Sequence, residues 1–235
     1  MRSLARLALL TGLILTTLPA HAALITYTDP LSFAAAANLT TIGFEGLGVA
    51  PNGSITYNNS TGLVISGVQF IGERTASTYA LAVVNPGNNT TYYDFGSGAG
   101  LKGPDYNVSP GFVPLIHIIL PSSVTAFGVD LMTLSPNALT YQATVLGTNI
   151  SVTTANRPTR TFFGVTSDTP ISSVDLTLTG TIQANGSQAL IDNVQFGSAD
   201  PPPVAEGCTL LLIGSGLGLL GFFRKRLQSQ APAAA

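Results

Sequence analysis

Residues 124–131 read VTAFGVDL, and apolar side chains occupy alternate positions towards the end of the run. Because successive side chains of a β-strand point to opposite faces, Phe127, Val129 and Leu131 are expected to share one face. Asp130 then lies on the other face, where it is expected to meet water. The stretch is therefore predicted to be a strand with one buried face.

Outward from this stretch, similar runs of Val, Ile, Thr and Phe are separated by Gly, Pro and Asn. The run SVDLTLT at 173–179 repeats the alternation and places Asp175 on the solvent face. Many short strands joined by turn residues indicate an all-β fold, an antiparallel two-sheet sandwich of the jelly-roll type. The strands are expected at 24–27, 41–45, 54–57, 63–71, 81–84, 92–95, 115–120, 124–131, 139–146, 149–154, 161–165, 173–179 and 189–196.

One helix is predicted near the start of this region. Asp29 is a residue type that caps helix N-termini, and Pro30 suits the first helical position. The residues that follow, LSFAAAANL at 31–39, are mostly good helix formers. A short helix lying across the rim of a sheet is expected here.

The last predicted strand carries an acidic residue at a core-facing position. In LIDNVQF, Asp192 has the same parity as Val194 and Phe196, which are expected to point inward. Burying a lone carboxylate costs several kcal/mol, so a cation or several hydrogen bonds must compensate it. A β-bulge that turns Asp192 outward is the alternative.

The N-terminus has the pattern of a secretory signal. Arg2 and Arg6 precede an apolar run at 7–18, and Ala20 and Ala22 form an A-x-A cleavage site. Cleavage after Ala22 is predicted, so that the mature chain begins at the next residue. A retained signal anchor is the alternative.

The C-terminus combines a proline spacer, an uncharged apolar segment at 209–223 and the basic cluster Arg224, Lys225 and Arg226. Fifteen helical residues span about 22 Å, which is short against a hydrocarbon core of about 30 Å. Positive residues on one flank keep that flank cytoplasmic and leave the body outside. The segment is predicted to be a marginal membrane span, either an ordinary anchor or a transient one.

This three-part layout resembles the PEP-CTERM sorting signal, which exosortase-type membrane enzymes recognise in Gram-negative bacteria that make exopolysaccharide. The family motif Val-Pro-Glu-Pro-Ser-Thr aligns with residues 204–209, where Glu206 and Thr209 match and both prolines are absent. Cys208 replaces the serine and is the single cysteine, so no intramolecular disulfide can form. The resemblance implies an exosortase-like partner that reads Val204, Glu206, Gly207, Cys208, Thr209, Arg224, Lys225 and Arg226.

The resulting division of the chain has five parts. They are a signal peptide at 1–22, a β-sandwich ectodomain at 23–198, a proline-rich spacer with the sorting motif at 199–208, a transmembrane helix at 209–223 and a basic cytoplasmic tail at 224–235. The order of motifs in the ectodomain, from TIGFEGL to ALIDNVQFG, resembles the jelly-roll ectodomain common among PEP-CTERM proteins. It is also similar in layout to galactose-binding-like β-sandwiches.

Such sandwiches often hold a structural Ca²⁺ between an early acidic residue and the last strand. The resemblance implies that Glu45 and Asp192 are the matching metal ligands, with carbonyls of Gly-rich loops providing further oxygens. The alternative is that Asp192 is bonded to backbone amides or to Arg74, with Glu45 solvated.

Composition and motifs narrow the function classes. Residues 23–203 contain four Lys or Arg and ten Asp or Glu, a formal charge of −6, which excludes nucleic acid as a partner. No GxSxG, HExxH, Walker or dinucleotide motif occurs.

His117, the single histidine after the signal, lies among apolar residues and is interpreted as a packed, hydrogen-bonded side chain. Paired loop carboxylates for glycoside hydrolysis, drawn from Glu73, Asp94 and Asp105, are not excluded.

Sugar binding is a competing function. Four tyrosines of the segment 79–106 lie near Asn and Asp residues, a combination that provides stacking surfaces and hydrogen bonds. The alternative is that these rings cover sheet edges. The four are Tyr79, Tyr92, Tyr93 and Tyr106.

The sequence therefore predicts an exported, non-enzymatic β-sandwich protein. It is held at the membrane by its C-terminal helix, then displayed on the cell surface or released, in association with extracellular polysaccharide of a biofilm matrix. A carbohydrate-binding module is the alternative.

Overall fold

The computed structural model describes residues 23–58, 61–74, 77–87, 98–104, 114–133, 137–179 and 189–200. The chain divides into two units, Met1–Ala199 and Asp200–Ala235. Nearly all of the described residues belong to the first unit. No helix within the described ranges is long and apolar enough to span a bilayer, and the segment 209–223 lies outside them.

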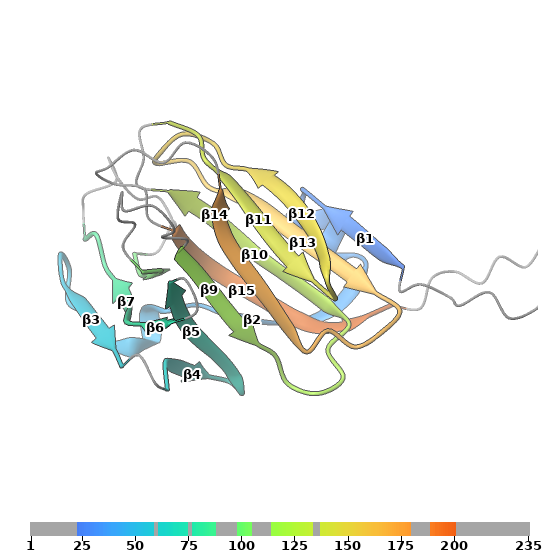
Figure 1. The fold of residues 1–235 in the computed structure, drawn as a ribbon, viewed down its shortest axis with the longest axis horizontal. Helices are drawn as coiled ribbons and strands as arrows, with labels where there is room; N and C mark the ends of the chain where they lie inside the picture. The colour runs from blue at the N-terminus through green and yellow to red at the C-terminus, as the bar shows by residue number, and fades with distance from the viewer. Residues whose placement is uncertain are drawn as a thin grey trace, which may run out of the picture. The chain divides into compact units, whose positions relative to one another are not determined.

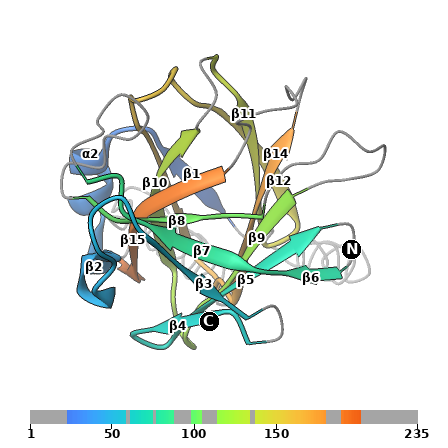
Figure 2. The same cartoon turned by 90° about the vertical axis from the view of Figure 1, so that its left-hand side faces the viewer.

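Two antiparallel β-sheets form a sandwich, as predicted (Figure 1). Figure 2 shows α2, β2 and β15 on one side of the molecule and β9, β12 and β14 on the other. Sheet A has the order β1 (Leu24–Tyr27), β13 (Thr161–Ser167), β10 (Ala126–Thr133), β15 (Ala189–Ala199), β8 (Gly100–Lys102), β7 (Leu81–Val84) and β3 (Ser54–Tyr57), and β2 (Ala37–Ile42) also pairs with β15. Sheet B has the order β12 (Thr148–Thr153), β11 (Thr140–Val145), β14 (Ser173–Thr179), β9 (Pro114–Ile119), β5 (Val68–Arg74) and β4 (Leu63–Ile65), with β6 (Ser77–Tyr79) beside β5.

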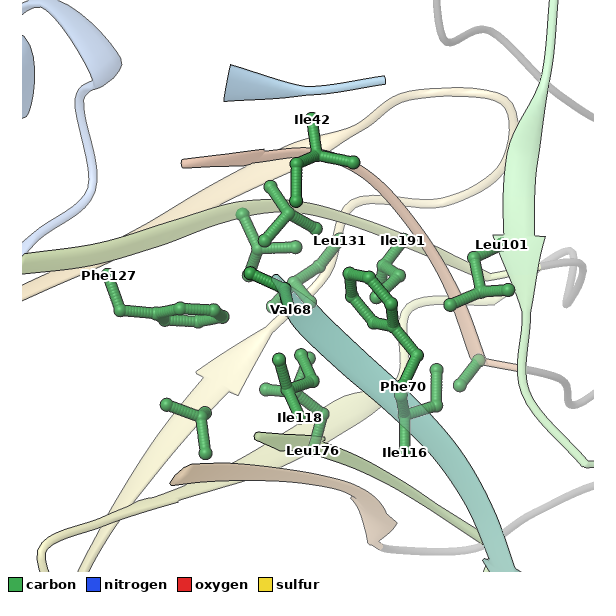
Figure 3. Packing of buried hydrophobic residues seen from close by; sticks show 14 of the residues in the cluster. Ile42, Val68, Phe70, Leu101, Ile116, Ile118, Phe127, Leu131, Leu176 and Ile191 are labelled. Carbon is green, nitrogen blue, oxygen red and sulfur yellow. The ribbon is translucent and has the colours of Figure 1, made fainter. Parts of the chain in front are cut away.

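The core lies between the sheets and follows the alternation read from the sequence. Phe127 and Leu131 of β10 are fully buried and face Leu176 of β14, which is also fully buried. Figure 3 shows these side chains converging with Val68 and Phe70 of β5. Burial of such aliphatic and aromatic side chains, at roughly 1.5–3 kcal/mol each, is the main driving force for closing the sandwich.

Most predicted strands match the structure. The strands β1, β3, β7 and β14 have the predicted bounds, and β9 to β13 and β15 differ by three residues or fewer at either end. The predicted strand 63–71 is instead a hairpin of β4 and β5. Ser66 and Gly67 form its turn with φ angles of 51° and 79°, the left-handed geometry that two-residue hairpin loops require. The predicted strand 92–95 lies outside the described residues.

The helix is shorter than predicted. Helix α2 (Pro30–Ala34) has the expected cap, because the backbone N–H of Ser32 donates to Asp29 Oδ2 at 2.8 Å. It ends early because residues from Ala37 onward pair with β15 as strand β2, and this pairing overrides the helical propensity of the alanines. The predicted strand 41–45 is correct only at its first two residues: β2 begins earlier and ends at Ile42, and the 3₁₀ helix η1 (Glu45–Leu47) follows.

Helix α2 covers part of the outer face of sheet A instead of crossing its rim. Gly128 of β10 and Gly164 of β13 are opposite each other in register. A Cβ atom would lie 2.6 Å from Phe33 at the first glycine and 2.9 Å at the second. The two glycines therefore form a flat seat for the Phe33 ring, which also packs against Phe162.

A buried tyrosine connects the two sheets. Tyr141 of β11, in sheet B, donates its hydroxyl hydrogen to the Met132 carbonyl at 2.7 Å. The same oxygen accepts from the Leu190 N–H at 3.0 Å. Met132 and Leu190 are register partners on β10 and β15. The hydroxyl thus bridges two neighbouring strands of sheet A from within the core.

Candidate functional site

Asp192 lies on the outer face of sheet A, which corrects the face predicted from parity. Gly128 pairs with Gln195 while Asp130 pairs with Asp192, so β15 has one more residue than β10 over this interval. This β-bulge includes Asn193, whose φ of 48° is left-handed, a conformation that Asn tolerates better than most residues. Past the bulge the parity reverses, and Asp192 no longer shares a face with Val194.

The outer position does not expose the carboxylate. Asp192 is completely buried, and neither carboxylate oxygen has a hydrogen-bond partner. Gln195 Oε1, nearby on the same strand, is also buried without a partner. The backbone N–H of Asn193 lies close enough to favour the charged carboxylate, although it does not reach hydrogen-bond geometry. Leaving such oxygens unpaired costs about 1–3 kcal/mol each, and more when they are charged.

The surroundings of Asp192 are unfavourable to a negative charge. The pKa of its carboxyl is raised from 3.8 to about 7, chiefly by burial and to a smaller extent by the nearby charges of Glu45 and Asp130. The N–H of Asn193 and the Arg160 guanidinium oppose this pKa rise. A cation at the carboxylate would remove the desolvation cost by replacing water as its partner.

Glu45 approaches Asp192 through the pairing of β2 with β15. Ile42 is opposite Val194, so the residues after Ile42 continue alongside the bulge. The Glu45 side chain folds back over Gly43, where a Cβ atom would meet Glu45 Oε2 at 2.3 Å. The early acidic residue and the last-strand carboxylate predicted from sequence are thus near enough for the charge of one to raise the pKa of the other.

Asp130 is the register partner of Asp192 on β10, but unlike Asp192 its carboxylate has hydrogen-bond donors. Its Oδ2 accepts from Asn193 Nδ2 at 2.8 Å and from Arg160 Nη1 at 3.3 Å. The side chain faces away from the core, as predicted, yet it is buried, so the expected solvent exposure is wrong. The bulge explains the difference, because it brings Asn193 over the carboxylate.

These oxygens suit a hard cation better than a transition metal. Within the described ranges, no group of three or more His, Cys, Asp or Glu side chains is arranged to hold a metal. The candidate oxygen ligands are the carboxylates of Glu45 and Asp192 and the amide oxygen of Gln195. Calcium takes six to eight oxygen ligands and accepts carbonyls and water among them. Sequence reasoning missed Gln195 because alternation places it on the outer face and Asp192 on the core face, and only the bulge brings both onto the same face.

His117 lies on the outer face of sheet B, in register with Asp175 of β14 on one side and Ile71 of β5 on the other. Its Nδ1 is 2.5 Å from Asp175 Oδ1, its register partner on β14. Ile116 and Ile118, on either side of it, point into the core. The hydrogen-bonded histidine predicted from sequence is present, but it is partly exposed.

Comparison with known proteins gave two solved structures, and no family model or curated protein matches this chain. One is a family 11 carbohydrate-binding module from Clostridium thermocellum in complex with a β-1,3-1,4-mixed-linked tetrasaccharide. It is 12% identical, with 70% of this chain and 98% of that chain covered, at a TM-score of 0.34. The family 11 module of the cellulosomal cellulase Lic26A-Cel5E of the same organism is 11% identical, with 70% and 96% covered, at a TM-score of 0.33.

Of the other residues singled out in the sequence, Glu73 lies on strand β5 and not in a loop. Those outside the described part of the chain include Tyr92, Tyr93 and Tyr106, the predicted cleavage-site residues Ala20 and Ala22, and the whole predicted sorting segment from Val204 to Arg226. Tyr79 is the last residue of β6, and its side chain is outside the description.

Proposed function

We propose that this chain is an exported, non-enzymatic β-sandwich protein that its C-terminal segment directs to the cell surface. The observation that carries the proposal is the order of spacer, polar motif, apolar segment and basic cluster at 201–226, which resembles a PEP-CTERM signal. An exosortase-like enzyme then processes the tail, and the sandwich, of the jelly-roll type, resides in an extracellular polysaccharide matrix.

The test is to determine the ends of the mature protein from its native host by mass spectrometry, together with cell fractionation. A chain that starts at Ala23, ends near Glu206 and lies outside the cytoplasmic membrane supports the proposal. A chain that reaches Ala235 in the membrane fraction would show an ordinary anchor and remove the case for a matrix role.

Calcium binding at the bulge belongs to the same proposal. The support is that both Asp192 oxygens and Gln195 Oε1, on the same strand, are buried without a hydrogen-bond partner, and that Glu45 is near enough for its charge to raise the pKa of Asp192. A bound Ca²⁺ would be held by oxygens of Glu45, Asp192 and Gln195, would supply the positive charge that the Asp192 carboxylate lacks, and would link η1 to the last strand. Because a ligand that binds the folded state stabilises it, chelator should lower the melting temperature. An unchanged midpoint in excess EDTA contradicts the site.

The second candidate is a carbohydrate-binding module centred on the tyrosines of the segment 79–106. Their proximity in sequence to Asn and Asp residues favours it. A glycan array should then show binding that Tyr92→Ala and Tyr93→Ala abolish. An array without binding removes this candidate.

A further inference from the structure

The outer face of sheet B presents polar side chains in rows that cross the strands. Ser151 of β12, Gln142 of β11 and Thr177 of β14 are aligned in register. Strands are about 4.8 Å apart, so a polymer lying across them meets a new side chain at each strand. A second row parallel to it consists of Asn149, Thr144, Asp175 and His117.

The two rows differ in how their polar groups are engaged. In the second row, Thr144 donates to Asn149 Oδ1 at 2.9 Å, and His117 is bonded to Asp175. In the first row, Ser151, Gln142 and Thr177 have no side-chain hydrogen bond among the described residues, and all three are at least partly exposed. The first row therefore offers hydrogen-bond donors and acceptors that a ligand could use. The polar groups of the second row are already bonded to one another.

The same face becomes apolar towards β4. Leu115 continues the first row on β9, opposite Thr177. Ile71 and Ile119 are also partly exposed, and Val64 of β4 is 61% exposed. Hydrogen-bonding groups therefore lie next to an aliphatic surface on one continuous sheet face, whose strands run side by side from β12 to β4 (Figure 1).

We propose that the outer face of sheet B binds a neutral polysaccharide. A pyranose chain has hydroxyl groups for the polar row and C–H faces for the aliphatic part. The charge balance favours a neutral chain, because the rows contain the acidic Asp175, which is hydrogen-bonded to His117, and the body carries a formal charge of −6. An acidic polymer would meet net repulsion. This inference rests on the proposed location in a polysaccharide matrix, and it assigns the binding surface within that function.

The experiment is affinity electrophoresis and calorimetry of the protein purified from its host, using a soluble neutral β-glucan, a galactomannan and, as acidic polymer, alginate. We expect binding to at least one neutral polymer and none to alginate. The double variant Gln142→Ala/Thr177→Ala should weaken this binding at least tenfold. Ser151→Arg, on the exposed edge strand β12, should weaken it by bulk without removing any core contact.

The matched control is Asn38→Ala/Thr40→Ala, two exposed polar residues on β2 of sheet A, which should leave binding unchanged. The proposal is overturned if the wild type binds no neutral polymer, or if the Gln142/Thr177 variant binds as well as the control. It is equally overturned if Tyr92→Ala/Tyr93→Ala alone abolishes binding. A correctly processed, secreted protein that binds no glycan would reject this inference and leave the export proposal standing.

Discussion

At the residue scale, Asp192 should make stability depend on pH. Its folded-state pKa of about 7 is above the ordinary 3.8, so between these pH values the folded state holds a proton that the unfolded state has lost. Stability therefore falls as pH rises through this window, by up to about 4 kcal/mol for a shift of this size. We expect the melting temperature in EDTA to fall from pH 4 to pH 7, with Ca²⁺ reversing most of the fall.

Asp192→Asn is the matched variant for this prediction, because it keeps the shape and removes the charge. It should be more stable than the wild type in EDTA at pH 7, and it should lose the response to Ca²⁺. If Ca²⁺ raises the melting temperature of the variant as much as that of the wild type, the ion binds elsewhere.

The Tyr141 hydroxyl should contribute measurably to stability. Tyr141→Phe leaves the Leu190 N–H without its 3.0 Å partner and removes the 2.7 Å bond to the Met132 carbonyl. Unpaired buried groups cost about 1–3 kcal/mol, which urea denaturation can resolve. Tyr57→Phe, at a partly exposed ring of β3, is the control and should change the free energy of unfolding little. Equal stability of both variants would mean that the strands re-pair without the bridge.

At the element scale, the packing of Phe33 of α2 on Gly128 predicts that a side chain at this glycine destabilises the fold. Gly128→Ala would place a methyl group 2.6 Å from the Phe33 ring, so the ring must move away from β10. We expect a loss of about 1–3 kcal/mol, measured by thermal or urea unfolding. Gly46→Ala is the control, because nothing lies within 4 Å of the added Cβ atom. A Gly128→Ala protein as stable as the control would show that α2 is not held by this contact.

The elements also show what sequence can and cannot predict. Strand β14 was predictable because its alternation is unbroken, with buried Val174, Leu176 and Leu178. The extent of α2 was not, since the alanines favour a helix and only long-range pairing with β15 turns Ala37 into a strand. The bulge at Asn193 is likewise a property of two paired strands and not of one. For that reason alternation alone placed Asp192 on the core face, and the outward-turning bulge that the sequence left as an alternative is the arrangement found.

At the scale of the whole molecule, β15 connects the features that bear on function. It lies between β10 and both β2 and β8 in sheet A, and its bulge carries Asp192. Its last residue, Ala199, is the first residue of the predicted spacer before the proposed sorting segment. A cation bound at the bulge would therefore stabilise the strand that joins the sandwich to its tail.

We expect removal of the proposed signal peptide to complete a contact at the end of the sandwich where β1 begins and β15 ends, since Ser167 and Gly197 both pair with Thr125 there. The backbone nitrogen of Ala23 is 3.1 Å from Asp168 Oδ1. Cleavage after Ala22 converts that nitrogen from an amide into a charged α-ammonium group, which forms an ion pair with the carboxylate. Exposed pairs contribute less than about 1 kcal/mol and weaken with salt.

We therefore expect Asp168→Asn to lower the melting temperature of the processed protein slightly at low salt and hardly at all at high salt. An unprocessed chain, obtained by changing Ala20 and Ala22 to bulky residues, lacks the ammonium group and should show no salt-dependent effect of Asp168→Asn. Differential scanning calorimetry of the four proteins at two salt concentrations makes the comparison. An equal effect of Asp168→Asn in processed and unprocessed chains would mean that the mature N-terminus does not start at Ala23 or that its charge remains solvated.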